Sequence, residues 1–146
     1  MRVLPDTPIW SAAFRRDDGV VNPWRTALQK LVVHGLVEII GPIRQELLSG
    51  IKERSKFELV RDRLRLFPDL EIKTEDYEEA ASYYNRCRAK GIQGSSTDYL
   101  ICAVAVRHDL AIFTDDNDFP GYARVLPIKL YPLGKPGIGS THDNSQ

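Results

Sequence analysis

Acidic side chains recur along this chain beside short apolar segments, where folding can bring them together. Asp98 stands in the first turn expected for an apolar helix, and Asp116 and Asp118 follow the next apolar run. Asp6 follows the apolar segment at the start of the chain, and Glu46 lies at the edge of an apolar helical face. Because ligands gather at the carboxyl ends of strands in open α/β sheets, these five acids predict one shared site.

The acids also predict the chemistry of the site. Carboxylates that are packed together repel and raise one another's pKa. A hard divalent cation removes this cost and prefers oxygen ligands, so the site predicts Mg²⁺ or Mn²⁺. An ion held by acids is best suited to in-line displacement at phosphorus, because it polarises the phosphoryl oxygen and helps to deprotonate a water.

Four of these acids also have an ordinary structural interpretation, and one of them, Asp118, suits an Asx turn. Asp6 precedes Thr7 and Pro8 and is a suitable helix N-cap. Asp98 in a first helical turn complements the helix dipole, and Glu46 is of a type that is common at the boundary of a buried face. Their joint placement, rather than any one of them, favours a functional site.

The segment after the apolar run at 110–113 leaves a choice between adjacent acids. Asp115 is well suited to a turn, yet it competes with Asp116 as a ligand. Alternation along an extended exit from a strand places Asp116 on the same face as Thr114 and Asp118, opposite Asp115. This pattern favours Asp116.

Short apolar segments alternate with helical patterns along the chain. Strands are expected at 2–5, 36–40, 70–72, 110–113 and 125–130, with helices in most of the intervening segments. This alternation predicts a three-layer α/β/α domain with a central, mainly parallel sheet, spanning residues 1–131. A Gly-, Pro- and Ser-containing tail at 132–146 is expected to be disordered.

Helical spacing predicts which faces are buried. One buried stripe is expected to contain Trp24, Ala27, Leu28, Leu31 and Val32. A second, in the helix after Thr74, is expected to contain Tyr77, Ala80, Ala81, Tyr84 and Cys87. The residues Pro120-Gly121-Tyr122 are expected to form a turn.

Composition limits the class of protein. The 146 residues carry 20 basic and 20 acidic side chains, so any attraction to a polyanion requires a local patch of positive charge. Cys87 and Cys102 have no metal-binding spacing and suit a reduced compartment. The start of the chain lacks the apolar core of a signal peptide, and no apolar run approaches the ~20 residues of a membrane span, which favours a cytoplasmic protein without membrane contact.

Other catalytic motifs are missing from the sequence. No GxSxG, GxxxxGK[ST] or GxGxxG pattern occurs. His34, His108 and His142 have no paired metal spacing. The acids remain the strongest chemical signal.

Four segments around the acids resemble the four acidic motifs of PIN domains, in particular those of VapC-type toxins of bacterial toxin–antitoxin pairs. The similarity covers about 3–130, and the order and spacing of the motifs carry it. The segments are Val3-Leu4-Pro5-Asp6-Thr7, Arg44-Gln45-Glu46-Leu47, Thr97-Asp98-Tyr99-Leu100-Ile101-Cys102-Ala103 and Thr114-Asp115-Asp116-Asn117-Asp118-Phe119.

The resemblance implies a Mg²⁺- or Mn²⁺-dependent endoribonuclease that acts on RNA, usually as a homodimer, and is inhibited by a cognate antitoxin protein. It implies that the core catalytic and metal-binding acids are Asp6, Glu46, Asp98 and Asp116. It further implies that Asp118 is a fifth metal ligand and that Thr114 orients the site. Two alternatives are a non-catalytic binding module with the PIN fold and a PIN nuclease outside toxin–antitoxin pairs.

Two departures from the family pattern qualify the resemblance: the adjacent acids Asp115 and Asp116, and two prolines near the first acid. Pro5 and Pro8 flank the first acid, where the family generally has an aliphatic residue before it and a small polar residue two positions after it. Candidate contacts for RNA phosphates are surface cations on segments that lead away from the expected crevice, and phosphate binding by them would be salt-dependent. These cations are Arg15, Arg16, Arg44, Lys52 and Arg54.

Overall fold

The computed structural model describes residues 1–15 and 19–132, and three short parallel strands form its centre. The strands are β1 (Val3–Pro5), β2 (Ala111–Phe113) and β3 (Lys129–Leu130), in the order β1-β2-β3. The side chains of β1 and β2 are buried, as expected for parallel strands that are covered on both faces. The tail at 133–146 and Arg16 lie outside the described residues.

Two of the expected strands are reduced to single parallel bridges. Val37 pairs with Val3, and Ile39 pairs with Asp69, in place of continuous strands at 36–40 and 70–72. The last strand covers only 129–130 of the expected 125–130, although it does lie at an edge of the sheet. Pro127 explains the late start, since proline donates no hydrogen bond to a ladder.

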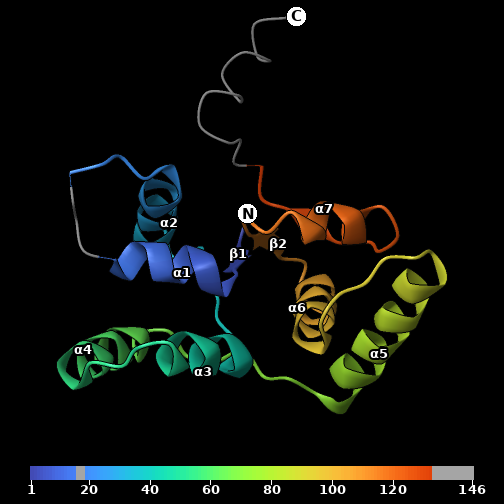
Figure 1. The fold of residues 1–146 in the computed structure, drawn as a ribbon, viewed down its shortest axis with the longest axis horizontal. Helices are drawn as coiled ribbons and strands as arrows, with labels where there is room; N and C mark the ends of the chain where they lie inside the picture. Colours follow the sequence, from blue (N-terminus) through green and yellow to red (C-terminus); the bar gives the residue numbers. More distant parts are fainter. Residues whose placement is uncertain (16–18, 133–146) are drawn as a thin grey trace, which may run out of the picture.

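Helices cover both sides of the strands (Figure 1). The first four, α1 to α4, lie on one side, and α5, α6 and α7 lie on the other. They are α1 (Thr7–Phe14), α2 (Pro23–Val33), α3 (Gly41–Ser49), α4 (Arg54–Leu64), α5 (Thr74–Ala89), α6 (Ser96–Arg107) and α7 (Asp118–Ala123). The expected α/β arrangement with a parallel sheet between helices is confirmed. Within the described residues, no helix is long and apolar enough to span a bilayer.

The central helix is α6, which packs against both α5 and β2. Every side chain from Tyr99 to Ala105 is buried, so this helix is apolar all round, as a helix inside a core must be. Ser95 caps it by accepting a hydrogen bond from the backbone N–H of Asp98 at 3.1 Å. The burial of α6 fixes the position of Asp98 in its first turn.

The expected buried face of α5 is partly wrong. Ala80 and Cys87 are buried, but Tyr77 and Tyr84 are 56% and 37% exposed, and Ala81 is exposed. The buried face instead contains Asp76, Ala80, Tyr83 and Cys87. The Asp76 carboxylate accepts hydrogen bonds of 2.6 and 2.7 Å from Arg107 of α6, and this ion pair turns Asp76 inward and Tyr77 outward.

Two smaller expectations are also corrected. Val32 in α2 is 37% exposed, although Leu28 and Leu31 of the same stripe are buried. The segment expected as a turn around Pro120 is helix α7. Proline is tolerated there because it lies in the first turn, where the backbone N–H has no partner within the helix.

Candidate active site

The pairing of β1 with β2 brings the first and last acidic segments together. Pro5 lies opposite Phe113, and the backbone N–H of Asp6 donates to the Phe113 carbonyl at 2.8 Å. Asp6 is also the N-cap of α1, so its structural and its functional interpretations are compatible. Because both strands are parallel and end at the same level, Asp6 and Thr114 emerge side by side.

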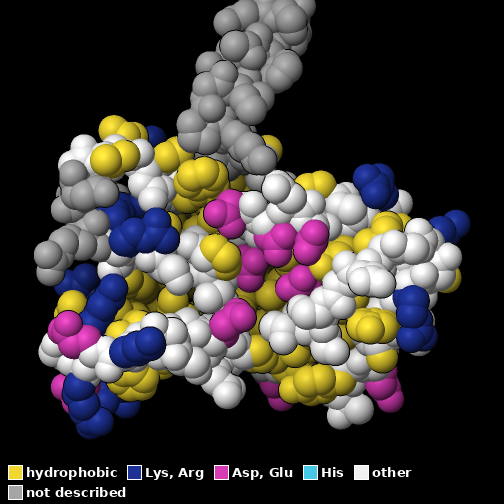
Figure 2. Space-filling model, viewed as in Figure 1, with side chains coloured by type: hydrophobic (Ala, Val, Ile, Leu, Met, Phe, Trp, Pro, Cys, Tyr) yellow, Lys and Arg dark blue, Asp and Glu magenta, His cyan; other side chains and the backbone are white. Residues whose placement is uncertain are grey.

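Three carboxylates converge beside this point. Asp98, Asp116 and Asp118 each offer one oxygen, and these oxygens lie within 4.8 Å of one another. Acidic side chains gather near the middle of the face in Figure 2. Asp115 does not belong to this triplet, in keeping with the alternation expected along the exit from β2. All three donors are oxygens, which is the ligand type that a hard divalent cation prefers.

Thr114 connects the triplet to Asp6. Its hydroxyl donates to Asp6 Oδ2 at 3.1 Å and accepts from the backbone N–H of Asp116 at 3.0 Å. Asp6 Oδ1 accepts from the backbone N–H of Thr7 at 2.9 Å, and Asp116 Oδ1 accepts from the N–H of Asp118 at 2.9 Å. One hydroxyl therefore holds two acidic segments in a fixed relation.

Glu46 lies apart from the triplet. It is exposed on α3, and its carboxylate accepts a hydrogen bond from the Thr7 hydroxyl. This bond ties α3 to the start of α1 and keeps the Glu46 charge close enough to act on Asp6. The five expected acids thus form one electrostatic group, in which three carboxylates make the tightest cluster.

Burial and crowding perturb two of the acids. Burial raises the pKa of Asp6 to about 6; the hydrogen bonds from Thr7 and Thr114 oppose this rise, while the charges of Asp98 and Glu46 add to it. Burial also raises the pKa of Asp98, against hydrogen bonds from Tyr122 and Ser95, and the charges of Asp116 and Asp118 add to that rise. Both shifts reflect a cost of holding negative charge that a cation would relieve.

Tyr122 is a site residue that the sequence did not reveal. Its buried hydroxyl donates to Asp98 Oδ2 at 2.7 Å. A Cβ added at Gly94 would lie 2.3 Å from the Tyr122 oxygen, so only glycine leaves room for this contact. A glycine just before the capping serine was the one available signal, and it does not point to a tyrosine so far along the chain.

The candidate RNA-binding cations have different surroundings. Arg44 is committed to the protein itself, since it pairs with Asp69 and donates to the carbonyls of Leu64 and Phe67. Arg54 forms an exposed pair with Glu58. Arg15 and Lys52 are exposed.

Comparison with known proteins identifies the family to which the domain belongs. The PIN domain profile matches residues 3–125, and the chain belongs to this family. It is 28% identical over 131 residues to VapC ribonuclease Mb1587 of Mycobacterium bovis and to ribonuclease VapC11 of Mycobacterium tuberculosis. Each alignment covers 87% of this chain and 96% of the relative.

Solved structures share the fold. A chain of FitAcB from Neisseria gonorrhoeae superposes with a TM-score of 0.71 at 20% identity, covering 88% of this chain and 96% of that one. A chain of VapBC2 from Rickettsia felis, bound to a DNA fragment from its promoter, gives a TM-score of 0.71 at 17% identity, with 90% and 98% covered. The relatives thus match the described fold over nearly its full length.

Proposed function

We propose that this chain is a divalent-metal-dependent endoribonuclease of the VapC type. The observation that carries the proposal is the convergence of Asp98, Asp116 and Asp118 within 4.8 Å, from two separate parts of a PIN fold. The relatives that carry the name ribonuclease span almost the whole chain and support RNA as the substrate.

We assign two roles to the acids: some bind the ion, and others add negative charge around it. Asp98, Asp116 and Asp118 would hold Mg²⁺ or Mn²⁺, while Asp6 and Glu46, which the sequence also suggested as ligands, lie outside this triplet and add negative charge near it. When bound, the ion polarises a phosphoryl oxygen and lowers the pKa of a water. Thr114 keeps Asp6 and Asp116 in register, and no side chain acts as a covalent nucleophile.

The test compares acids that differ in position but not in type. Asp98→Asn is expected to lower RNA cleavage by at least about 100-fold, because it removes a ligand from the triplet. Asp115→Asn, next to the triplet but outside it, keeps wild-type cleavage. EDTA abolishes wild-type cleavage and Mn²⁺ restores it. Unchanged cleavage in Asp98→Asn contradicts the proposal.

The partners belong to the same proposal. A cognate antitoxin protein is expected to inhibit the enzyme, as the likeness to VapC-type toxins implies. The cytoplasm is the expected compartment, because Cys87 and Cys102 are both buried free thiols.

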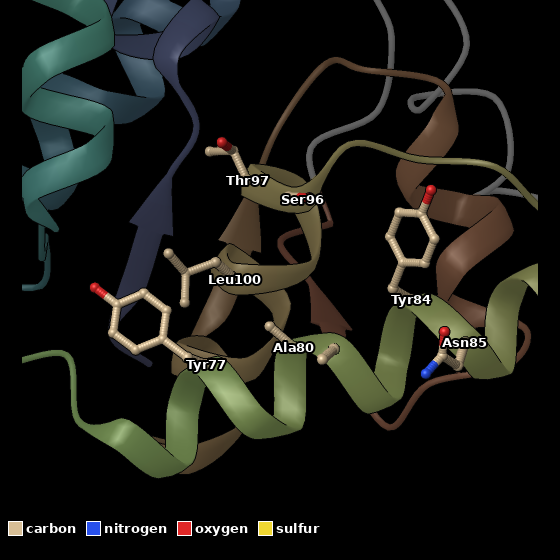
Figure 3. Close-up of a pocket in the computed structure, with 8 residues that line it drawn as sticks. Tyr77, Ala80, Tyr84, Asn85, Ser96, Thr97 and Leu100 are labelled. Carbon is tan, nitrogen blue, oxygen red and sulfur yellow. The ribbon is translucent and has the colours of Figure 1, made fainter.

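A second copy of the chain is the proposed occupant of the hollow between α5 and α6. This α5–α6 hollow holds about 410 Å³, and Tyr77 and Tyr84 stand along it with Leu100 and Thr97 of α6 facing them (Figure 3). Among the residues that the structure describes, no charged side chain lines it. Exposed tyrosines around a small apolar centre are typical of a protein interface.

The charge order of α5 supports a symmetric pair. Its first turn carries Glu75, and its last turn carries Arg86 and Arg88, while Asp76 of the first turn is buried in the ion pair with Arg107. Two copies of α5 packed antiparallel about a twofold axis bring the acidic end of each helix to the basic end of the other. The two ends of the helix are therefore complementary in charge.

A further inference from the structure

A second hollow borders the acidic site on the opposite side, and it differs from the α5–α6 hollow in its charge. This α1–α3 hollow holds about 330 Å³, within the range of small ligand pockets. Glu46 and Thr7, which are joined by a hydrogen bond, belong both to its wall and to the acidic site. A molecule that enters the hollow therefore lies against Glu46 and Thr7, at the edge of the acidic site.

The wall of this hollow combines apolar and cationic side chains. Phe14, Leu47 and Ile51 supply its apolar surface, and Arg15 and Lys56 supply its positive charge. Lys and Arg side chains are visible in Figure 2 over α1, α2 and α4, beside the acidic cluster. A wall of apolar side chains with two cations matches a nucleotide, which has a flat base and an anionic phosphate.

The two cations are available for a ligand. Among residues 1–15 and 19–132, no acid forms an ion pair with Arg15 or Lys56, and both side chains are exposed. Arg44 of α3 and Arg54 of α4 are paired with Asp69 and Glu58. Because the net charge of the chain is zero, an RNA backbone can be attracted only by such local groups.

We infer that the α1–α3 hollow binds the nucleotide next to the bond that is cut. Its base lies against Phe14, Leu47 and Ile51, and its phosphate lies between Arg15 and Lys56. The base must be unpaired to enter, so the substrate is single-stranded RNA at this point. This inference rests on the proposed nuclease function and adds the path of the substrate to it.

Binding of a labelled single-stranded oligouridylate tests the inference, measured by anisotropy over a range of salt concentrations. Asp98→Asn provides the background in which RNA is not cut. In that background, Arg15→Ala with Lys56→Ala is expected to weaken binding by about 10-fold or more. The slope of log affinity against log salt falls by about 0.7 for each lost phosphate contact. Phe14→Leu weakens binding about 5-fold through lost stacking and leaves the slope unchanged.

The matched control is Arg63→Ala, which removes an exposed cation from the same helix as Lys56 but outside the hollow. If the double variant binds RNA with the affinity and salt slope of this control, the inference is wrong. Loss of antitoxin binding with retained RNA binding also overturns it, because the hollow then serves the inhibitor. Thermal unfolding of each variant shows whether the fold is intact.

Failure of the nuclease proposal has a different signature. Wild-type protein that cuts no RNA in Mg²⁺ or Mn²⁺ contradicts the proposed function, whatever the binding measurements give. Wild-type protein that cuts RNA, with variants that bind like the control, refutes only the assignment of the hollow.

Discussion

The hollows on the two sides of the acidic cluster differ in the side chains that line them. The described residues that line the α5–α6 hollow are tyrosines, small residues, a leucine and an asparagine, and none of them is charged. The α1–α3 hollow has a similar volume but carries Arg15, Lys56 and Glu46. The two hollows therefore differ in the charge of their lining and not in their size. The comparison suggests that one side is built for a protein surface and the other for a polyanion.

The acids themselves differ in the same way across the site. Asp6, on the α1 side, is 6% exposed and has hydrogen-bond donors on both oxygens. Asp98, on the α6 side, is less buried, and its carboxylate accepts a hydrogen bond from the Tyr122 hydroxyl. Asp6 therefore bears the larger free-energy cost of ionisation, and the more exposed acids, such as Asp98, lie where an ion can reach them.

The largest expected effect is on the pH dependence of stability. The folded protein holds the Asp6 proton up to pH about 6, above the ordinary value of 3.8, so this contribution to stability is complete below 3.8 and is lost as the pH rises through 6. In EDTA, Asp6→Asn should therefore be more stable than wild type at pH 8, by up to about 3 kcal/mol, and equal to it near pH 3.5.

Urea unfolding at several pH values measures this difference. Asparagine keeps the N-cap of α1, so the substitution does not add a capping defect. Asp115→Asn, at an exposed neighbouring acid, serves as the control. If the free energies of unfolding of Asp6→Asn and wild type differ by the same amount at every pH, ionisation of Asp6 carries no cost in stability.

A second prediction separates the two hollows by their partners. Tyr77→Ala with Tyr84→Ala is expected to weaken self-association by about 30-fold or more, because buried tyrosines dominate many protein interfaces. The same variant keeps wild-type affinity for single-stranded RNA. Sedimentation measures the first property and anisotropy the second.

Leu59→Ala is the control for loss of an exposed apolar side chain, since Leu59 is 51% exposed on α4 and lines neither hollow. If the tyrosine variant associates as tightly as this control, the copy does not bind at α5. If it loses RNA affinity instead, the two hollows have been assigned the wrong way round.

The third prediction concerns the support of Asp98 from α7. Gly94→Ala places a Cβ 2.3 Å from the Tyr122 hydroxyl, which must move away from Asp98. Overpacking of this kind costs about 1–3 kcal/mol, and the displaced tyrosine should also weaken Mn²⁺ binding. In Gly50→Ala the nearest atom to the added Cβ is at 3.7 Å, an ordinary contact, and neither property should change. Calorimetry and urea unfolding that do not distinguish these variants would exclude a supporting role for Tyr122.

The nearness of Asp6, Asp98 and the residues after β2 could be predicted because it depends on local features, whereas Glu46 lies apart from the triplet. Asp6 and Thr114 follow strands that pair in parallel, and Asp98 follows a capping serine, so the chain order alone brings them to one edge. The parallel sheet between helices could be predicted for the same reason, since each strand and helix has its own apolar pattern.

The features that could not be predicted depend on contacts between distant residues. The orientation of α5 is set by the ion pair of Asp76 with Arg107, and helical spacing alone fits two different buried faces. The hydrogen bond from Tyr122 to Asp98 requires the space left by Gly94. In each case the local pattern permits several arrangements, and a single tertiary contact selects one.

The most direct test of the central claim is titration of Mn²⁺ into the purified, antitoxin-free protein, followed by calorimetry. Wild type and Asp115→Asn are expected to bind the ion saturably, and Asp116→Asn is expected to lose binding, because only Asp116 belongs to the triplet with Asp98 and Asp118. Absence of binding in the wild type, or equal binding in Asp116→Asn, would contradict the assignment of this acidic cluster as a metal site.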